Sequence, residues 1–282
     1  MIAARSDRAF LAVAALMFLL SILITVAWCG SMASMPGMPM PGGWRMSMAW
    51  MRMPDQSWAG LAGSFLGMWS VMMVAMMLPS LVPMLLRYRA AMTHAGQAAG
   101  LAWPTVCVGI GYLIVWAVLG VAVLAVGVAL AMAEMQSSAL SRAVPFAAGI
   151  VVLLAGAVQF TPWKRRHLAC CREAPGFGSR LPADAGTALR QGLRYGFDCA
   201  LCCANLIAIL LVLGVMDLGA MAVVGLAITL ERLVAWDRLV VRAIGAAALA
   251  VGLVLTTFAV IPSASTISWA RTPTTASPKA PL

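Results

Sequence analysis

The sequence contains few charged residues and almost no histidine. Only 10% of its 282 residues are charged, against roughly 25% in soluble domains, and it has two histidines. Hydrophobic residues make up 63% of the chain, and its mean hydropathy is +0.95. A chain of this composition cannot be kept in water, so the sequence excludes a soluble protein and leaves no room for a soluble catalytic domain.

Motifs of catalysis and of nucleic-acid binding are also missing. The sequence shows no nucleophile–base pair, no phosphate-binding glycine loop and no His-rich zinc motif, so we expect no enzymatic activity. The net charge of +10 could suggest a nucleic-acid partner. However, the basic residues are scattered between apolar runs and form no continuous patch, which indicates membrane topology instead.

Long apolar runs account for most of the chain. They cover residues 9–29, 59–86, 101–132, 143–161, 197–215, 218–236 and 239–262. Each has about the length of a helix that crosses a bilayer, so the sequence predicts an all-α, polytopic membrane bundle of about seven transmembrane helices. The first run resembles a signal peptide, but it is long enough to span and Trp28 disfavours a small-residue cleavage site, so we interpret it as a retained helix.

The distribution of basic residues predicts the orientation of the bundle. If the N-terminus is cytoplasmic, most lysines and arginines lie on the cytoplasmic side, as the positive-inside rule requires. We therefore predict a multi-pass protein of a bacterial inner membrane. The expected parts are a first transmembrane helix (1–29), an outer loop rich in Met, Pro and Gly (30–57), a six-helix membrane core (58–262) with a basic, Cys-containing cytoplasmic loop (162–196), and a disordered outer tail (263–282).

The outer loop is unusually rich in methionine. It contains Met32, Met35, Met38, Met40, Met46, Met48, Met51 and Met53. Methionine usually fills hydrophobic cores, but an exposed segment rich in Pro and Gly has no core to fill. A thioether is a neutral, soft donor that prefers Cu(I) or Ag(I), so one hypothesis is metal capture. The other is a segment whose methionines rest on lipid.

The second apolar run carries a further group of methionines. At 100° per residue, Met72, Met73 and Met76 share one arc of a helix, with Met77 beside it. A methionine stripe at this spacing is often ordinary packing. Its alternative is a path of thioethers through the membrane, and the similar Met-x-x-x-Met spacing of eukaryotic copper uptake channels supports this by analogy.

Five of the seven cysteines gather on the expected cytoplasmic side, where thiols stay reduced. Cys199, Cys202 and Cys203 are spaced i, i+3 and i+4, which places them on one helix face. Cys170, Cys171 and His167 lie in the preceding loop. Buried cysteines can be simple hydrophobes, but five clustered ones favour a soft-metal site. A zinc or iron–sulfur site is the alternative, although no repeated Cys-x-x-Cys pair argues for it. Glu231 and Arg232, a functional or a structural charge pair, lie near the inner end of the sixth run.

Three stretches resemble a bacterial family of uncharacterised, predicted metal-binding integral membrane proteins. They are Met72 to Pro79, Gln159 to Lys164 leading to Cys170, and Gly192 through Cys199, Cys202 and Cys203 to Glu231 and Arg232. The resemblance covers about residues 60–245 and implies metal binding. The family usually has Trp after its second Cys pair and Lys after the Glu, where this chain has Ala204 and Arg232. The sulfur ligands are intact in this chain.

These patterns together predict an integral membrane protein that binds a soft metal, for which we expect Cu(I), and that takes part in its transport or delivery across the inner membrane. Its expected partners are the lipid bilayer, the metal ion and a metallochaperone or membrane protein, with no nucleic acid. Two alternatives stay open. One is a membrane thiol–disulfide oxidoreductase or redox sensor. The other is a non-transporting assembly or scaffold subunit.

Overall fold

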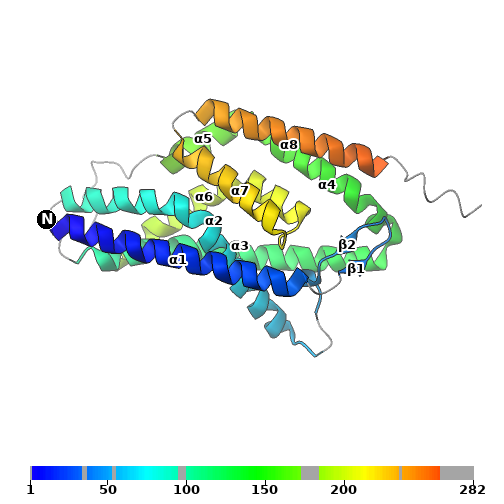
Figure 1. Cartoon of the computed structure of the whole chain (residues 1–282), viewed down its shortest axis with the longest axis horizontal. Coiled ribbons are helices and arrows are strands. Elements are labelled where there is room, and N and C mark those ends of the chain that lie inside the picture. Colours follow the sequence, from blue (N-terminus) through cyan, green and yellow to red (C-terminus); the bar gives the residue numbers. More distant parts are fainter. Residues whose placement is uncertain are drawn as a thin grey trace, which may run out of the picture.

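The computed structural model describes residues 2–33, 37–52, 55–94, 100–172, 184–234 and 237–260. These residues form eight α-helices, one 3-10 helix and two short strands (Figure 1). The helices are α1 (Ile2–Ala33), α2 (Trp58–His94), α3 (Ala102–Gln136), α4 (Ser138–Val158), α5 (Pro162–Arg172), α6 (Ala185–Leu213), α7 (Leu218–Leu233) and α8 (Asp237–Val260). The predicted all-α fold is confirmed. The predicted tail, 263–282, lies outside the described residues.

Six of the described helices are long and apolar enough to cross a membrane. They are α1, α2, α3, α4, α6 and α8. Each of the seven predicted runs coincides with a helix, but α7 has only 16 residues. At 1.5 Å per residue it is about 24 Å long, shorter than a typical hydrocarbon core of about 30 Å. The expectation of seven spans is therefore supported for six helices.

The outer faces of these helices are apolar. Leu16 and Leu23 of α1 are each 67% exposed, and Phe258 of α8 is 74% exposed. In a protein surrounded by water such a surface would be unfavourable, whereas lipid tails accommodate it without loss. The exposed apolar surface therefore agrees with the membrane character expected from composition.

The bundle has two ends, which we name by the position of the N-terminus. At the near end, α1, α3, α6 and α8 begin, and α2, α4 and α7 end. At the far end, α1, α3, α6 and α8 end, and α2, α4 and α7 begin. Figure 1 shows the near end on the left, beside the label N, and the far end on the right. This alternation is the pattern of helices that cross one layer repeatedly.

Helix α6 packs closely against α3, and two glycines allow it. A side chain at Gly192 of α6 would collide with the backbone of Val108, and one at Gly111 of α3 would collide with the backbone carbonyl of Leu189. Small residues let membrane helices approach until their backbones touch. Helix α2 contacts both α3 and α7, so α6, α3, α2 and α7 enclose a common interior.

Two parts of the predicted cytoplasmic loop 162–196 are helical. Residues 162–172 form α5, which begins with Pro162 in the first turn, and the Thr161 hydroxyl accepts a hydrogen bond from the Lys164 amide at 3.3 Å. Helix α6 begins at Ala185 instead of 197, because Asp184 caps it by accepting from the Thr187 amide at 3.2 Å. Residues 173–183 lie outside the described part of the chain.

The predicted outer loop 30–57 is partly folded. Helix α1 continues to Ala33, strands β1 (Met38–Pro39) and β2 (Arg45–Met46) pair in antiparallel fashion, and η1 covers Met48–Trp50. Met40 and Met46 are buried in a small cluster with Ala131 of α3. The expectation that this segment has no core to fill is wrong for these two methionines. Met35 and Met53 fall outside the described residues.

Candidate metal centre

The three cysteines of α6 are buried in the interior of the near half of the bundle. Cys199 and Cys202 are fully buried, and Cys203 is 2% exposed. They lie on the part of α6 that follows the glycine contact with α3, and the described thiols are free. The spacing of these residues in one helix therefore does bring cysteines together in a place that solvent does not reach.

Two of these thiols form a compact group with a methionine of α2. The Sγ atoms of Cys199 and Cys203 are 3.9 Å apart, and the Sδ atom of Met77 is 4.0 Å from Cys199 Sγ. If metal–sulfur bonds are about 2.3 Å, three sulfurs around one trigonal ion lie about 4.0 Å apart. The two measured separations match that value. Cys199 is thus spaced from one thiol and one thioether as two sulfur ligands of a three-coordinate soft ion would be.

The Cys199 sulfur also receives polar contacts from two other helices. Arg232 of α7 donates from Nη1 to Cys199 Sγ at 3.0 Å, and the Tyr112 hydroxyl of α3 lies 3.0 Å from the same sulfur. Arg232 Nη1 also donates to Ser80 Oγ of α2 at 2.9 Å. Among the described side chains no carboxylate pairs with Arg232. Its positive charge therefore points at the sulfur group, where it would stabilise the negative charge of a thiolate.

A buried ion pair supports the cysteine helix from the side. The Lys164 ammonium group of α5 is 2.7 Å from Glu231 Oε2 of α7, and it donates to the Cys202 carbonyl at 2.7 Å and to Asn205 Oδ1 at 3.2 Å. Gln159 donates to the other Glu231 oxygen at 2.7 Å. Both charges are buried, paired and hydrogen-bonded, which is the condition for holding them in an apolar interior. The pair joins α5, α6 and α7 around the site.

The basic residues that precede the cysteines in sequence differ in their surroundings. Arg166 and Arg194 are exposed, whereas Lys164 is buried. Lys164 forms an ion pair with Glu231, so the ion-pair partner of Glu231 is Lys164 and not its sequence neighbour Arg232. The cation at the thiols is Arg232 itself.

The remaining predicted ligands in α5 are placed differently. Cys171 is half-buried and donates to the backbone carbonyl of Asp198 at 3.2 Å. Hydrogen bonding with Cys202, and then burial, raise the pKa of the Cys171 thiol well above its ordinary value. His167 stacks its ring edge-on against Trp163, with centroids 4.6 Å apart. The side chain of Cys170 lies outside the described part of the structure.

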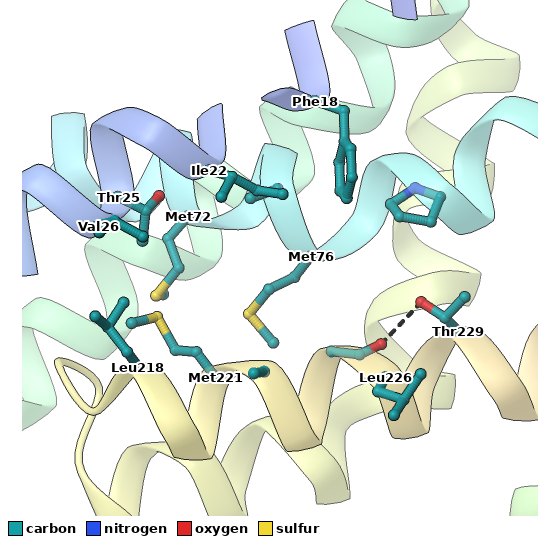
Figure 2. Close-up of a pocket in the computed structure, with 14 residues that line it drawn as sticks. Phe18, Ile22, Thr25, Val26, Met72, Met76, Leu218, Met221, Leu226 and Thr229 are labelled. Carbon is teal, nitrogen blue, oxygen red and sulfur yellow. Dashed lines mark hydrogen bonds between the residues drawn. The ribbon is translucent and has the colours of Figure 1, made fainter. Parts of the chain in front are cut away.

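The other predicted methionines of α2 lie on two sides of that helix. Met73 is fully buried. Met72 and Met76 line a cavity of about 450 Å³ between α1, α2 and α7, which Met221 of α7 also lines. Figure 2 shows the sulfur atoms of Met72, Met76 and Met221 pointing into this space. Met77, one residue beyond Met76, turns to the cysteines. The stripe therefore leads from an apolar cavity to the thiol group.

Sequence reasoning missed three parts of this site. Tyr112 and Ser80 were not selected, and Arg232 was noted only as a charge beside Glu231. A tyrosine and an arginine inside apolar helices are costly and call for a partner, which is the signal that could have identified them. Within the described residues, no three His, Cys, Asp or Glu side chains converge as ligands of one ion. The third sulfur of the group comes from a methionine.

Comparison with known proteins points to copper. The sequence model of one family, PpoB2, described as a copper chaperone, matches residues 66–255. The matched range contains Met77, Cys199, Cys203 and Arg232. Neither a curated protein nor a solved structure matches the chain. Because the match covers about two thirds of the sequence, the chain belongs to the PpoB2 copper chaperone family.

Proposed function

We propose that this protein binds Cu(I) at the sulfur group of Met77, Cys199 and Cys203 and takes part in its transport or delivery across a bacterial inner membrane. The observation that carries the proposal is the pair of sulfur separations, 3.9 Å and 4.0 Å, in a site that solvent does not reach. Membership of a copper chaperone family supports the same metal.

The charges around the sulfur group support a monovalent ion. Two thiolates carry two negative charges, Arg232 carries one positive charge, and Cu(I) supplies the second. The site is then neutral, whereas a divalent ion such as zinc would leave a positive charge in an apolar interior. Because isolated charges are costly there, this balance favours Cu(I). Thiolates and thioethers are also the donors that Cu(I) prefers.

The order of donors along α2 supports movement toward the thiols. Met72 and Met76 offer neutral thioethers in the apolar cavity, and Met77 lies next to the cysteines. A thiolate binds a soft cation more strongly than a thioether because it is charged. A Cu(I) ion that enters at the far end would therefore move to better donors as it approaches the near end. Met72, Met73, Met76 and Met77 are the proposed passage.

Thiol–disulfide chemistry is the second function considered from sequence. It would use neighbouring thiols, either Cys202 and Cys203 or Cys170 and Cys171. The raised pKa of Cys171 keeps its thiol protonated at neutral pH, and a protonated thiol is a poor attacking group. This observation argues against Cys171 as the attacking thiol of an exchange reaction.

Copper analysis of two variants tests the proposed function. The protein is purified in detergent under reducing, oxygen-free conditions, loaded with Cu(I) and desalted, and its copper content is measured by mass spectrometry. We expect Cys199→Ser combined with Cys203→Ser to lose one bound Cu(I) per chain. Cys29→Ser is the matched control, because Cys29 is also buried but lies at the far end of α1, and it should retain wild-type copper. Equal copper in wild type and double variant would refute the site and favour the scaffold function.

A further inference from the structure

A second cavity, of about 200 Å³, lies at the far end of the bundle. Five of the side chains that line it are methionines: Met32, Met48, Met51, Met68 and Met216. They come from four segments that are distant in sequence, namely the end of α1, the segment around η1, α2, and the turn between α6 and α7. The fold therefore collects thioethers that no single sequence pattern unites.

These methionines differ from those that serve as packing. Met40 and Met46, in the same far-end segment, are buried at 8% and 1% exposure in the cluster with Ala131. Met32, Met48, Met51 and Met216 are only half-buried and border open volume, although Met51 also packs against that cluster and Met216 against the main core. A methionine used as filler closes gaps in a core. The half-buried methionines leave a gap that their side chains surround.

The lining of the cavity suits one class of ligand. None of the described residues that line it is Asp or Glu, and its side-chain oxygens are those of Gln56 and Ser64, so the cavity offers little to a hard divalent cation, which prefers carboxylates. Thioethers are soft and neutral, and the rings of Trp28 and Phe65, which also line the cavity, attract cations through their faces. These donors select a soft, monovalent cation that is not strongly hydrated.

The cavity lies next to the proposed passage along α2. Met68 lines it, and Met72 and Met76, four and eight residues further along α2, line the larger cavity. Residues four apart lie one above the other on a helix, so the three side chains form a row about 12 Å long. Each step along this row is about 6 Å, and the row ends one residue before Met77.

We propose that the far-end cavity is a thioether site that receives Cu(I) or Ag(I) and passes the ion to the row on α2. This site deepens the proposed function and rests on it for the direction of movement. Its ability to bind an ion is independent of the cysteines, because none of its donors belongs to the near-end sulfur group. The two sites therefore are separable by substitution.

The test measures Ag(I) binding in a protein whose near-end site has been removed. Ag(I) is a soft ion that keeps its oxidation state, and silver nitrate in chloride-free buffer is the probe. The background carries Cys199→Ser and Cys203→Ser and also has the five other cysteines replaced by Ser, because thiols bind Ag(I) more strongly than thioethers do. We expect this protein to bind one Ag(I) in a calorimetric titration. Adding Met48→Leu, Met51→Leu and Met216→Leu should weaken that binding at least tenfold, since leucine keeps the volume and removes the sulfur. Met38→Leu is the matched control, because Met38 is 39% exposed and does not line the cavity.

A footprint on the unmutated protein guards against misfolding of the variants. Hydrogen peroxide oxidises accessible thioethers to sulfoxides, which mass spectrometry assigns to individual residues. Ag(I) should slow oxidation of Met48, Met51 and Met216 and leave Met38 unaffected. Silver binding within twofold of the background protein after the three leucine substitutions, or no protection by Ag(I), would overturn the proposal. If removing Cys199 and Cys203 does not lower the wild-type stoichiometry, the proposed function fails, and the leucine variants and the footprint still decide the far-end site.

Discussion

At the residue scale, Arg232 shows how one side chain can place a positive charge beside a buried sulfur group. Its guanidinium donates to Cys199 Sγ at 3.0 Å and to Ser80 Oγ at 2.9 Å. Two thiolates and a monovalent ion would leave one net negative charge in the interior, and the arginine removes it. The same arginine would oppose the binding of a divalent ion.

We therefore expect Arg232→Gln to weaken Cu(I) binding by about tenfold or more, because a charge-assisted hydrogen bond contributes about 1.5–3 kcal/mol. The measurement is competition with a Cu(I) chelator of known affinity. Arg232→Lys, which keeps the charge, should bind Cu(I) close to the wild-type level. Wild-type affinity in the glutamine variant would show that the charge at this position has no part in binding.

The cysteines of the site could be predicted because their spacing is a property of one helix. Cys199 and Cys203 are one turn apart in any α-helix, whatever surrounds it. Tyr112 and Arg232 reach Cys199 from two other helices, and Ser80 of a third helix accepts a hydrogen bond from Arg232. No periodicity within a helix reports which helices are neighbours, so these contacts could not be derived from the sequence alone.

At the scale of elements, the contact between α3 and α6 determines the position of the cysteines. Gly111 and Gly192 let the two backbones touch, and Tyr112, beside Gly111, reaches Cys199 seven residues beyond Gly192. If α6 moved away from α3, the hydroxyl would leave the sulfur. The glycines therefore affect the site by setting the separation between α3 and α6, without contacting the thiols.

A larger side chain at this contact should disturb both fold and site. For Gly192→Leu we expect a loss of stability of about 1–3 kcal/mol, typical of overpacking, and weaker Cu(I) binding. The measurements are the thermal unfolding midpoint and the copper content of the detergent-purified protein. Gly109→Ala is the control, because no atom lies within 4 Å of an added Cβ there. If both variants behave like wild type, the helices are not held at the described separation.

The elements that the sequence predicted well are the apolar ones. Seven runs coincide with helices because an apolar segment of that length must satisfy its own backbone in a membrane. Helix α5 was missed because it is short and polar, Pro-Trp-Lys-Arg-Arg-His in its first half, and such composition is typical of a loop. The ammonium group of its buried Lys164 bonds to α6 and α7 within the described structure, and the sequence of α5 contains neither partner.

At the scale of the whole molecule, the sulfur atoms of the two cavities and of the thiol group lie one after another along the bundle. The far-end cavity holds Met68, the larger cavity holds Met72 and Met76, and the near half of the bundle holds Met77 and the thiols. The direction in which an ion would travel therefore depends on how the bundle sits in the membrane. A near end facing the cytoplasm makes the thiols the inner terminus.

We expect the near end to face the cytoplasm, because most basic residues would then lie inside. A phosphatase that is active only outside the cytoplasm should be active when fused after Pro262 and inactive when fused near Gly178. A green fluorescent reporter that folds inside should give the opposite result at both positions. The reverse pattern for both reporters would show that the bundle has the opposite orientation, and the proposed direction of movement would then be export instead of uptake.

The placement of Cys199 and Cys203 on one helix also affects how the protein withstands oxidants, which copper itself generates in air. Their Cβ atoms, one turn apart, are held about 5–6 Å from each other by the helix, whereas a disulfide needs about 3.5–4.5 Å. The two thiols can share an ion at a sulfur separation of 3.9 Å without being able to bond to each other unless the helix unwinds. If Cu(I) binds here as proposed, the oxidants that it generates would meet two thiols that cannot form a disulfide with each other.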